Sequence, residues 1–157
     1  MQPNVESPSR FAAAGAPDDR PEDVGGQGAR VSKASAGRVL IVEDNWLVAL
    51  EMEAALLDAN YAVLGIAVSS AEAVAACERE RPDFVLMDIR LHGRTDGVDA
   101  AVMIRERFDI PSIFVSAHDD AETRSRAEAA KPLGWIVKPF PSTELIKRIE
   151  SFRRAAK

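Results

Sequence analysis

The sequence predicts an α/β protein with a three-layer, doubly wound fold built around a five-stranded parallel sheet. Short, almost uninterrupted apolar runs alternate five times with longer segments whose apolar residues recur at helical spacing. Apolar runs of this kind are typical of strands buried on both faces, and strands that alternate with amphipathic helices form parallel sheets. With right-handed crossovers, the helices cover both faces of the sheet.

The first two strand–helix pairs begin with strands predicted at 39–42 and 61–68. In the first helix, helical spacing places four apolar residues on one face, as in a helix that covers a sheet: Leu47, Leu50, Ala54 and Leu57. Ser69 and Glu72 have the spacing of a capping box, which starts the second helix, and that helix ends near Glu80.

The last three strands are again short apolar runs, at 84–87, 111–115 and 135–137. Pro82 separates the second helix from the third strand. Each of the last three helices has a start signal. Asp96-Gly97 marks a turn before a helix over 98–108, and Asp119 with Glu122 caps a helix that ends near Ala130. Pro141 is suited to the first turn of the last helix. From Asp120 to Ala130 the apolar residues are all alanine, which predicts a weakly anchored helix.

Residues 1–37 differ in composition from the rest of the chain. They hold four of the nine prolines and five of the nine glycines, and their few large apolar residues show no helix or strand period. Such a segment buries too little apolar surface to offset the entropy lost when it is ordered. The sequence therefore predicts a disordered tail over 1–37 and one folded domain over 38–157.

Composition excludes several classes of protein. The formal charge of −5 and the pI of about 5.1 argue against a general binder of nucleic acid or of anionic membranes. No apolar run approaches the roughly 18 residues that cross a bilayer, and the first residues do not resemble a signal peptide. The single cysteine, Cys77, excludes an intrachain disulfide and is expected to be a small core or boundary residue. We expect a cytoplasmic protein.

Charged or hydroxyl side chains follow four of the five predicted strands. They are Glu43 and Asp44 after the first strand, Asp88 after the third, Ser116 after the fourth and Lys138 after the fifth. The carboxyl ends of parallel strands meet at one edge of the sheet, where doubly wound folds bind their ligands. Three carboxylates gathered there require a cation, and oxygen ligands without a His or Cys cluster suit Mg²⁺. A lysine and a serine beside them suit phosphoryl oxygens, so the set predicts a phosphoryl-transfer site.

Four segments around these residues resemble the receiver domain of two-component response regulators: Val39-Leu-Ile-Val-Glu-Asp44, Leu86-Met-Asp88, Phe114-Val-Ser116-Ala117 and Val137-Lys-Pro-Phe140. The resemblance covers about 38–155 and implies a flavodoxin-like fold of five βα units. Nothing that resembles a DNA-binding or enzymatic output domain follows, so we expect a stand-alone, single-domain response regulator. Such a protein takes its phosphoryl group from a sensor histidine kinase or a histidine phosphotransfer protein, and it then acts on a downstream protein.

The resemblance also implies a role for each residue at the strand ends. Asp88 would be the phosphoacceptor, a carboxylate nucleophile beside a metal. Lys138 would pair with the phosphoryl oxygens, Ser116 would move toward them, and the peptide bond before Pro139 would be cis. Mg²⁺ would be held by Glu43, Asp44, Asp88 and the backbone carbonyl of Arg90.

Other positions would transmit or tune the signal. Trp135 falls at the switch aromatic of the family, which works together with Ser116. Arg90 and His118 fall at two positions that tune the lifetime of the phosphoryl group. His92 stands where proline is usual, so the loop after Asp88 should be less rigid, which would alter partner choice or dephosphorylation without abolishing phosphorylation. The family's surface of fourth helix, fifth strand and fifth helix would bind a partner or form a homodimer.

Two further functions compete with this interpretation. The first is a receiver-like binding module whose interactions need no phosphate, which is disfavoured because every acid and the lysine are present. The second is a hydrolase of the haloacid dehalogenase type, which needs a second acid two residues after the nucleophile, where this chain has Arg90. A dinucleotide-binding fold would need a Gly-x-Gly-x-x-Gly turn after the first strand. We expect no enzyme with substrate turnover, only self-phosphorylation and slow autodephosphorylation.

Overall fold

The computed structural model describes residues 34–93, 95–117 and 119–157. The expected tail, apart from its last four residues, and His118 lie outside these ranges. Five strands are formed: β1 (Gly37–Val42), β2 (Tyr61–Ala67), β3 (Phe84–Met87), β4 (Ser112–Ser116) and β5 (Gly134–Val137). The helices are α2 (Trp46–Asp58), α3 (Ser70–Glu80), α4 (Gly97–Phe108), α5 (Ala121–Ala127) with the 3₁₀ turn η2 (Glu128–Ala130), and α6 (Ser142–Ala155).

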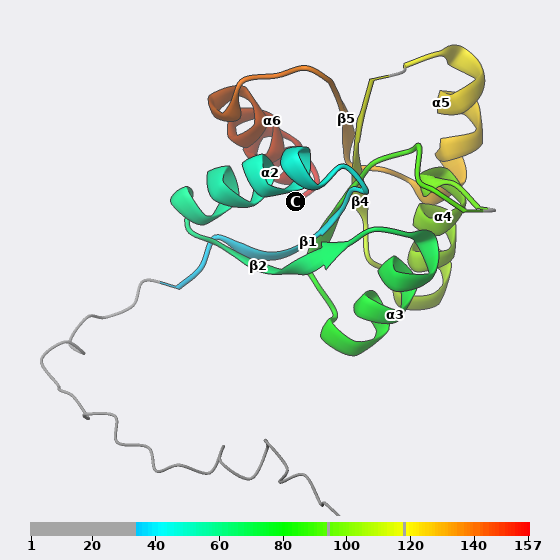
Figure 1. Ribbon diagram of the computed structural model, residues 1–157, viewed down its shortest axis with the longest axis horizontal. Coiled ribbons are helices and arrows are strands. Elements are labelled where there is room, and N and C mark those ends of the chain that lie inside the picture. The colour runs from blue at the N-terminus through cyan, green and yellow to red at the C-terminus, as the bar shows by residue number, and fades with distance from the viewer. Residues whose placement is uncertain (1–33, 94, 118) are drawn as a thin grey trace, which may run out of the picture. The chain divides into compact units, whose positions relative to one another are not determined.

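The sheet is parallel throughout and has the strand order β2-β1-β3-β4-β5. Helices α2 and α6 cover one face of the sheet, and α3, α4 and α5 cover the other (Figure 1). This arrangement confirms the three-layer, doubly wound fold. The strand order reverses between β1 and β3, so the carboxyl ends of these two strands lie side by side at the point where such folds bind ligands.

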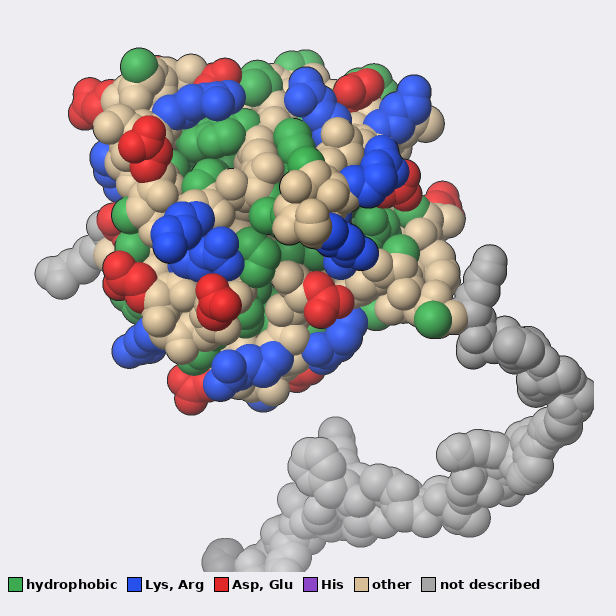
Figure 2. All heavy atoms as spheres, turned by 180° about the vertical axis from the view of Figure 1, so that it is seen from behind, with side chains coloured by type: hydrophobic (Ala, Val, Ile, Leu, Met, Phe, Trp, Pro, Cys, Tyr) green, Lys and Arg blue, Asp and Glu red, His purple; other side chains and the backbone are tan. Residues whose placement is uncertain are grey.

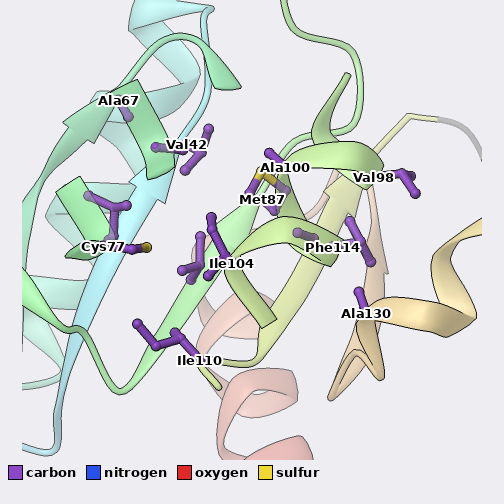
Figure 3. Close-up of a cluster of buried hydrophobic side chains, with 14 of the residues drawn as sticks. Val42, Ala67, Cys77, Met87, Val98, Ala100, Ile104, Ile110, Phe114 and Ala130 are labelled. Atoms are coloured by element: carbon purple, nitrogen blue, oxygen red, sulfur yellow. The ribbon is translucent and has the colours of Figure 1, made fainter. Parts of the chain in front are cut away.

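Apolar side chains form one cluster on each face of the sheet. The cluster under α3, α4 and α5 contains Val42 and Met87 from the sheet and Ile104 from α4 (Figure 3). Cys77 lies fully buried in the same cluster, and its burial raises the pKa of the thiol to about 12. The thiol is therefore unreactive at neutral pH, and the expected core position of Cys77 is confirmed.

Helix α2 presents a different face to the sheet from the one that we expected. Its buried residues are Ala49, Met52, Ala55 and Leu56, whereas the four residues predicted on its sheet-covering face, Leu47, Leu50, Ala54 and Leu57, are exposed. The reason is that α2 is apolar on nearly all sides, with only three polar residues in thirteen, so helical spacing alone matches more than one face. The result is an apolar face that points to solvent.

The N-cap of helix α5 lies one residue later than we expected. Asp120, and not Asp119, is the N-cap, and its carboxylate accepts a hydrogen bond from the Thr123 N–H at 2.8 Å. The helix has only seven residues, of which Ala127 alone is buried, and it then tightens into η2. The apolar surface that holds α5 against the sheet is therefore small, as its alanine-only composition predicted.

The surface of the domain mixes charges of both signs. On the face shown in Figure 2, Lys and Arg side chains alternate with Asp and Glu side chains around exposed hydrophobic side chains. Among the described residues, no helix combines the length and the apolar character that a membrane span requires.

Replacing Ser112 with alanine is expected to stabilise the protein. The Ser112 side chain is 1% exposed, and its hydroxyl has no hydrogen-bond partner among the described residues. Removing an unsatisfied buried hydroxyl should raise the free energy of unfolding by about 1 kcal/mol. Urea unfolding measures the change, and Ser151→Ala on the exposed side of α6 serves as the control. A loss of stability in Ser112→Ala would show that the hydroxyl has a partner.

Candidate functional site

The acidic residues lie at the carboxyl ends of the two central strands where the strand order reverses. Glu43 and Asp44 follow β1, and Asp88 follows β3. Backbone hydrogen bonds continue the sheet to this point: the Asp88 N–H donates to the Val42 carbonyl, and the Glu43 N–H donates to the Ala67 carbonyl, both at 2.9 Å. The two chain segments therefore leave the sheet side by side, which brings their carboxylates together.

The three carboxylates form a compact cluster. One oxygen from each of Glu43, Asp44 and Asp88 lies within 4.8 Å of the others. Glu43 is 1% exposed and Asp88 is 6% exposed, so most of this charge is shielded from water. Three oxygen donors without nitrogen or sulfur are the set that a hard divalent cation such as Mg²⁺ prefers. The residues present therefore fit the predicted magnesium site.

Lys138 supplies the positive charge beside this cluster. It follows β5, and its Nζ donates to Glu43 Oε1 at 2.8 Å and lies 3.6 Å from Asp88 Oδ1. The peptide bond between Lys138 and Pro139 is cis, as the resemblance implied. The Lys138 N–H donates to the carbonyl of Ser116, which ends β4 and is buried. One lysine among three carboxylates leaves a net negative charge for a cation to compensate.

The pKa of Asp88 reflects this environment. Burial, followed by the charge of Glu43, raises the pKa of the Asp88 carboxyl from 3.8 to about 7, although Lys138 acts in the opposite direction. Near neutral pH, part of the metal-free protein therefore carries a protonated Asp88. A divalent cation favours the ionised carboxylate, so metal binding and loss of this proton should accompany each other.

Two residues that sequence analysis had not placed at this site contact its acids. The Asn45 N–H donates to Glu43 Oε2 at 3.1 Å, while the Asn45 side chain caps α2 by accepting from the Val48 N–H. Asn45 could have been recognised, because an asparagine directly before an apolar helix is a typical N-cap. The mostly exposed His92 imidazole pairs with the Asp44 carboxylate. No local pattern in the sequence indicates that contact.

Of the expected switch and tuning residues, Trp135 lies on β5 and Arg90 follows β3. Trp135 is partly buried on β5, and its ring packs on that of Phe114 with centroids 4.7 Å apart and planes 32° apart. The Arg124 guanidinium also lies over the Trp135 ring, 4.7 Å from its centroid. Arg90 is exposed in the loop after β3. His118, the second predicted tuning residue, lies outside the described residues.

A groove continues from the site along α2. It has a volume of about 220 Å³ and runs between α2 and the segment that joins β5 to α6. Its lining includes Val48, Glu51 and Met52 on one side and Lys138, Pro139 and Phe140 on the other. Because Lys138 lines the groove and also contacts the acidic cluster, the groove ends next to that cluster.

Comparisons with known proteins point to one family. The response regulator receiver domain matches residues 39–150. The chain is 35% identical over 113 residues to the transcriptional regulatory protein PdtaR of Mycobacterium tuberculosis and covers 55% of it. It is 34% identical over 114 residues to the phyllosphere-induced regulator PhyR of Methylorubrum extorquens and covers 42% of it. Each match includes 72% of this chain. The chain therefore spans about half the length of these relatives, 55% of one and 42% of the other.

Solved receiver structures agree with this match. The signal receiver domain of a modulated diguanylate cyclase from Desulfovibrio desulfuricans G20 is 37% identical, with a TM-score of 0.68 over 73% of this chain and 91% of that one. A CheY-like receiver domain from Methanospirillum hungatei has a TM-score of 0.69 at 24% identity, over 76% of this chain and 96% of that one. The second likeness concerns the fold alone.

Proposed function

Because the chain belongs to the family of response regulator receiver domains, we propose that Asp88 accepts a phosphoryl group from a phosphohistidine of a partner protein. The observation that carries this proposal is the cluster of Glu43, Asp44 and Asp88 with Lys138 at the edge of the sheet. The partner would be a sensor histidine kinase or a histidine phosphotransfer protein. The phosphorylated form would then bind a downstream protein.

The chemistry follows from the side chains present. An Asp88 carboxylate oxygen forms the new bond to phosphorus as the bond between phosphorus and the imidazole nitrogen of the donor breaks. The imidazole keeps the electron pair and takes up a proton. Lys138, which lies 3.6 Å from Asp88 Oδ1, would leave Glu43 and pair with the phosphoryl oxygens. Ser116 would donate a hydrogen bond to the same oxygens.

Mg²⁺ is the cofactor that we propose for this reaction. It would be held by Glu43, Asp44, Asp88 and the backbone carbonyl of Arg90. When bound, the ion supplies positive charge that offsets the negative charge of the incoming phosphoryl group. Arg90 and His118 would tune the lifetime of the acyl phosphate by controlling the access of water. The protein would be a cytoplasmic phosphoacceptor and not an enzyme with substrate turnover.

Beryllofluoride, which mimics an aspartyl phosphate, provides the test. Added with Mg²⁺ to the purified protein, it should produce a saturable change in tryptophan fluorescence that is absent without Mg²⁺. Trp46, at the start of α2, and Trp135 are placed to report it. If neither fluorescence nor NMR shifts respond, the alternative holds, and the chain is a receiver-like module that binds partners without phosphate.

We further propose that the phosphodonor docks on the exposed apolar face of α2. This face consists of Leu47, Leu50, Ala54 and Leu57, and it begins three residues after Asp44. The spacing of three, four and three residues is that of a coiled-coil seam, which pairs with another helix. A helix seated there would lie beside the groove that ends at Lys138.

The charges of α2 indicate which helix fits. Its polar residues, Glu51, Glu53 and Asp58, are all acidic. A second copy of α2 would therefore meet like charges, whereas a helix with lysine or arginine beside its apolar seam would be attracted. We expect a helical phosphodonor domain with basic flanks on this face. A homodimer would instead use the surface formed by α5, β5 and α6.

Leu50→Glu should slow phosphoryl transfer from a protein donor without affecting the acceptor site. A charge in the middle of the apolar face should reduce the transfer rate from a phosphorylated histidine phosphotransfer protein about tenfold. Uptake from acetyl phosphate, which needs no docking, should stay at the wild-type rate. Met103→Glu on α4 is the matched control, because Met103 and Leu50 are each 39% exposed. Equal transfer rates in the two variants would exclude this face.

A further inference from the structure

Helix α5 is held against the domain mainly by two arginines. Only Ala127 of its seven residues is buried, so apolar packing contributes little. Arg126 donates to both carboxylate oxygens of Asp96, the N-cap of α4, at 3.0 and 3.1 Å. Arg124 turns toward the sheet and lies over the ring of Trp135. The position of α5 therefore depends on polar contacts that can be exchanged.

Trp135 lies between Arg124 and Phe114. Parallel pairing of β4 with β5 places Phe114 opposite Trp135, and the two rings pack with centroids 4.7 Å apart. The guanidinium of Arg124 is 4.7 Å from the ring centroid, within the range of a cation–π contact. Asp119, just before α5, pairs with the same guanidinium and so fixes its position. The indole is thus held by the sheet and by α5 at once.

Strand β4 connects the Phe114–Trp135 pair to the proposed phosphoryl site. Ser116 is two residues beyond Phe114 on β4, so the two side chains project from the same face of the sheet. In the register of the sheet, Ser116 pairs with Val137, two residues beyond Trp135. A displacement of Ser116 toward a phosphoryl group therefore opens space next to the Phe114–Trp135 pair. For the indole to enter that space, its contact with Arg124 must break.

We infer that Arg124 is a positioning residue that holds Trp135 in its unphosphorylated place and releases α5 when the indole moves. This inference rests on the proposed phosphorylation of Asp88 and adds a residue outside the acceptor site. The contact stabilises the unphosphorylated state alone. Removing it should therefore favour the phosphorylated state, although Arg124 touches neither Asp88 nor its acidic neighbours among the contacts of the described residues.

Arg124→Gln in a Trp46→Phe background provides the test, because Trp135 is then the single tryptophan of the chain. Without ligand, its emission should already lie part of the way toward the value that the parent reaches with Mg²⁺ and beryllofluoride. The beryllofluoride concentration at half-saturation should fall about two- to fivefold, the factor that corresponds to one exposed cation–π contact. Arg124→Lys, which keeps the cation, should restore most of the parent behaviour.

Arg148→Gln on α6 is the matched control, since Arg148 is about as exposed as Arg124, at 46% against 47%, and pairs with Glu144 of its own helix. It should leave the ligand-free emission of Trp135 unchanged. If Arg124→Gln has the same emission and the same half-saturation as the parent, the role of Arg124 is wrong. If the parent itself does not respond to beryllofluoride, the proposed function fails, and the ligand-free emission of the two variants still decides whether Arg124 holds the indole.

Discussion

Asp88→Asn is expected to abolish phosphoryl uptake while the fold is retained. The amide has the shape of the carboxylate, but it is a poor nucleophile, so the bond to phosphorus should not form. Incubation with acetyl phosphate and Mg²⁺ followed by intact-mass measurement should show one added phosphoryl group on the wild type and none on the variant. Asp58→Asn, an exposed change of the same kind at the end of α2, should take up phosphate normally. Wild-type uptake by Asp88→Asn would mean that another residue is the acceptor.

The same substitution should remove a pH dependence of stability. In the metal-free protein the pKa of Asp88 is raised from 3.8 to about 7, so the folded state holds this proton more tightly than the unfolded chain does. The free energy of unfolding contributed by Asp88 therefore falls as the pH rises from about 4 to about 7. Asparagine binds no proton, and this part of the fall should disappear. Urea unfolding in EDTA at pH 5 and pH 7.5 measures it, and an unchanged slope would contradict the assignment.

Gly97→Ala is expected to have the largest effect on stability of any single methyl group added to the domain. A Cβ at Gly97 would lie 1.9 Å from the backbone carbonyl oxygen of Asp88 and 2.8 Å from the Cα of Ile89. The Gly97 N–H also donates to the Ile89 carbonyl at 2.7 Å, so the first turn of α4 cannot move away without losing this bond. We expect the free energy of unfolding to fall by about 3 kcal/mol.

The same clash should weaken beryllofluoride binding, because it displaces the backbone of Asp88, the proposed phosphoacceptor. Gly37→Ala is a suitable control, since its Cβ would meet only the end of the Arg153 side chain, which can turn aside. Urea unfolding of the two variants gives the comparison. If Gly97→Ala is as stable as Gly37→Ala, then the first turn of α4 does not pack against the backbone of Asp88 and Ile89 as described.

Local patterns were sufficient for the order of elements and for the residues at the strand ends. Pro82, Ser69 and the short apolar runs marked where helices and strands begin and end, and each strand lies within two residues of its expected bounds. Glu43 and Asp88 could be placed together because parallel strands in a doubly wound sheet end at one edge. That inference needs only the alternation of strands and helices.

Local patterns could not predict which of two apolar helix faces is buried or which of two neighbouring acids caps a helix. In α2 both the exposed and the buried faces are apolar, and only packing against the sheet selects Met52 and Leu56 over Leu47 and Leu50. The spacing of Asp119 and Glu122 predicted a cap one residue too early: Asp120 caps α5, and Asp119 pairs with Arg124 instead.

The sequence alone determined a parallel α/β domain with three acids, a serine and a lysine at one sheet edge, because hydrophobic period and strand ends are local properties of the chain. The tertiary structure decided what those residues contact: Lys138 on Glu43, Asn45 on the other oxygen of that acid, and Arg124 on Trp135. These contacts join residues that are distant along the chain or depend on the direction of a side chain. Long-range contacts and side-chain directions are fixed only when the sheet and its helices pack together.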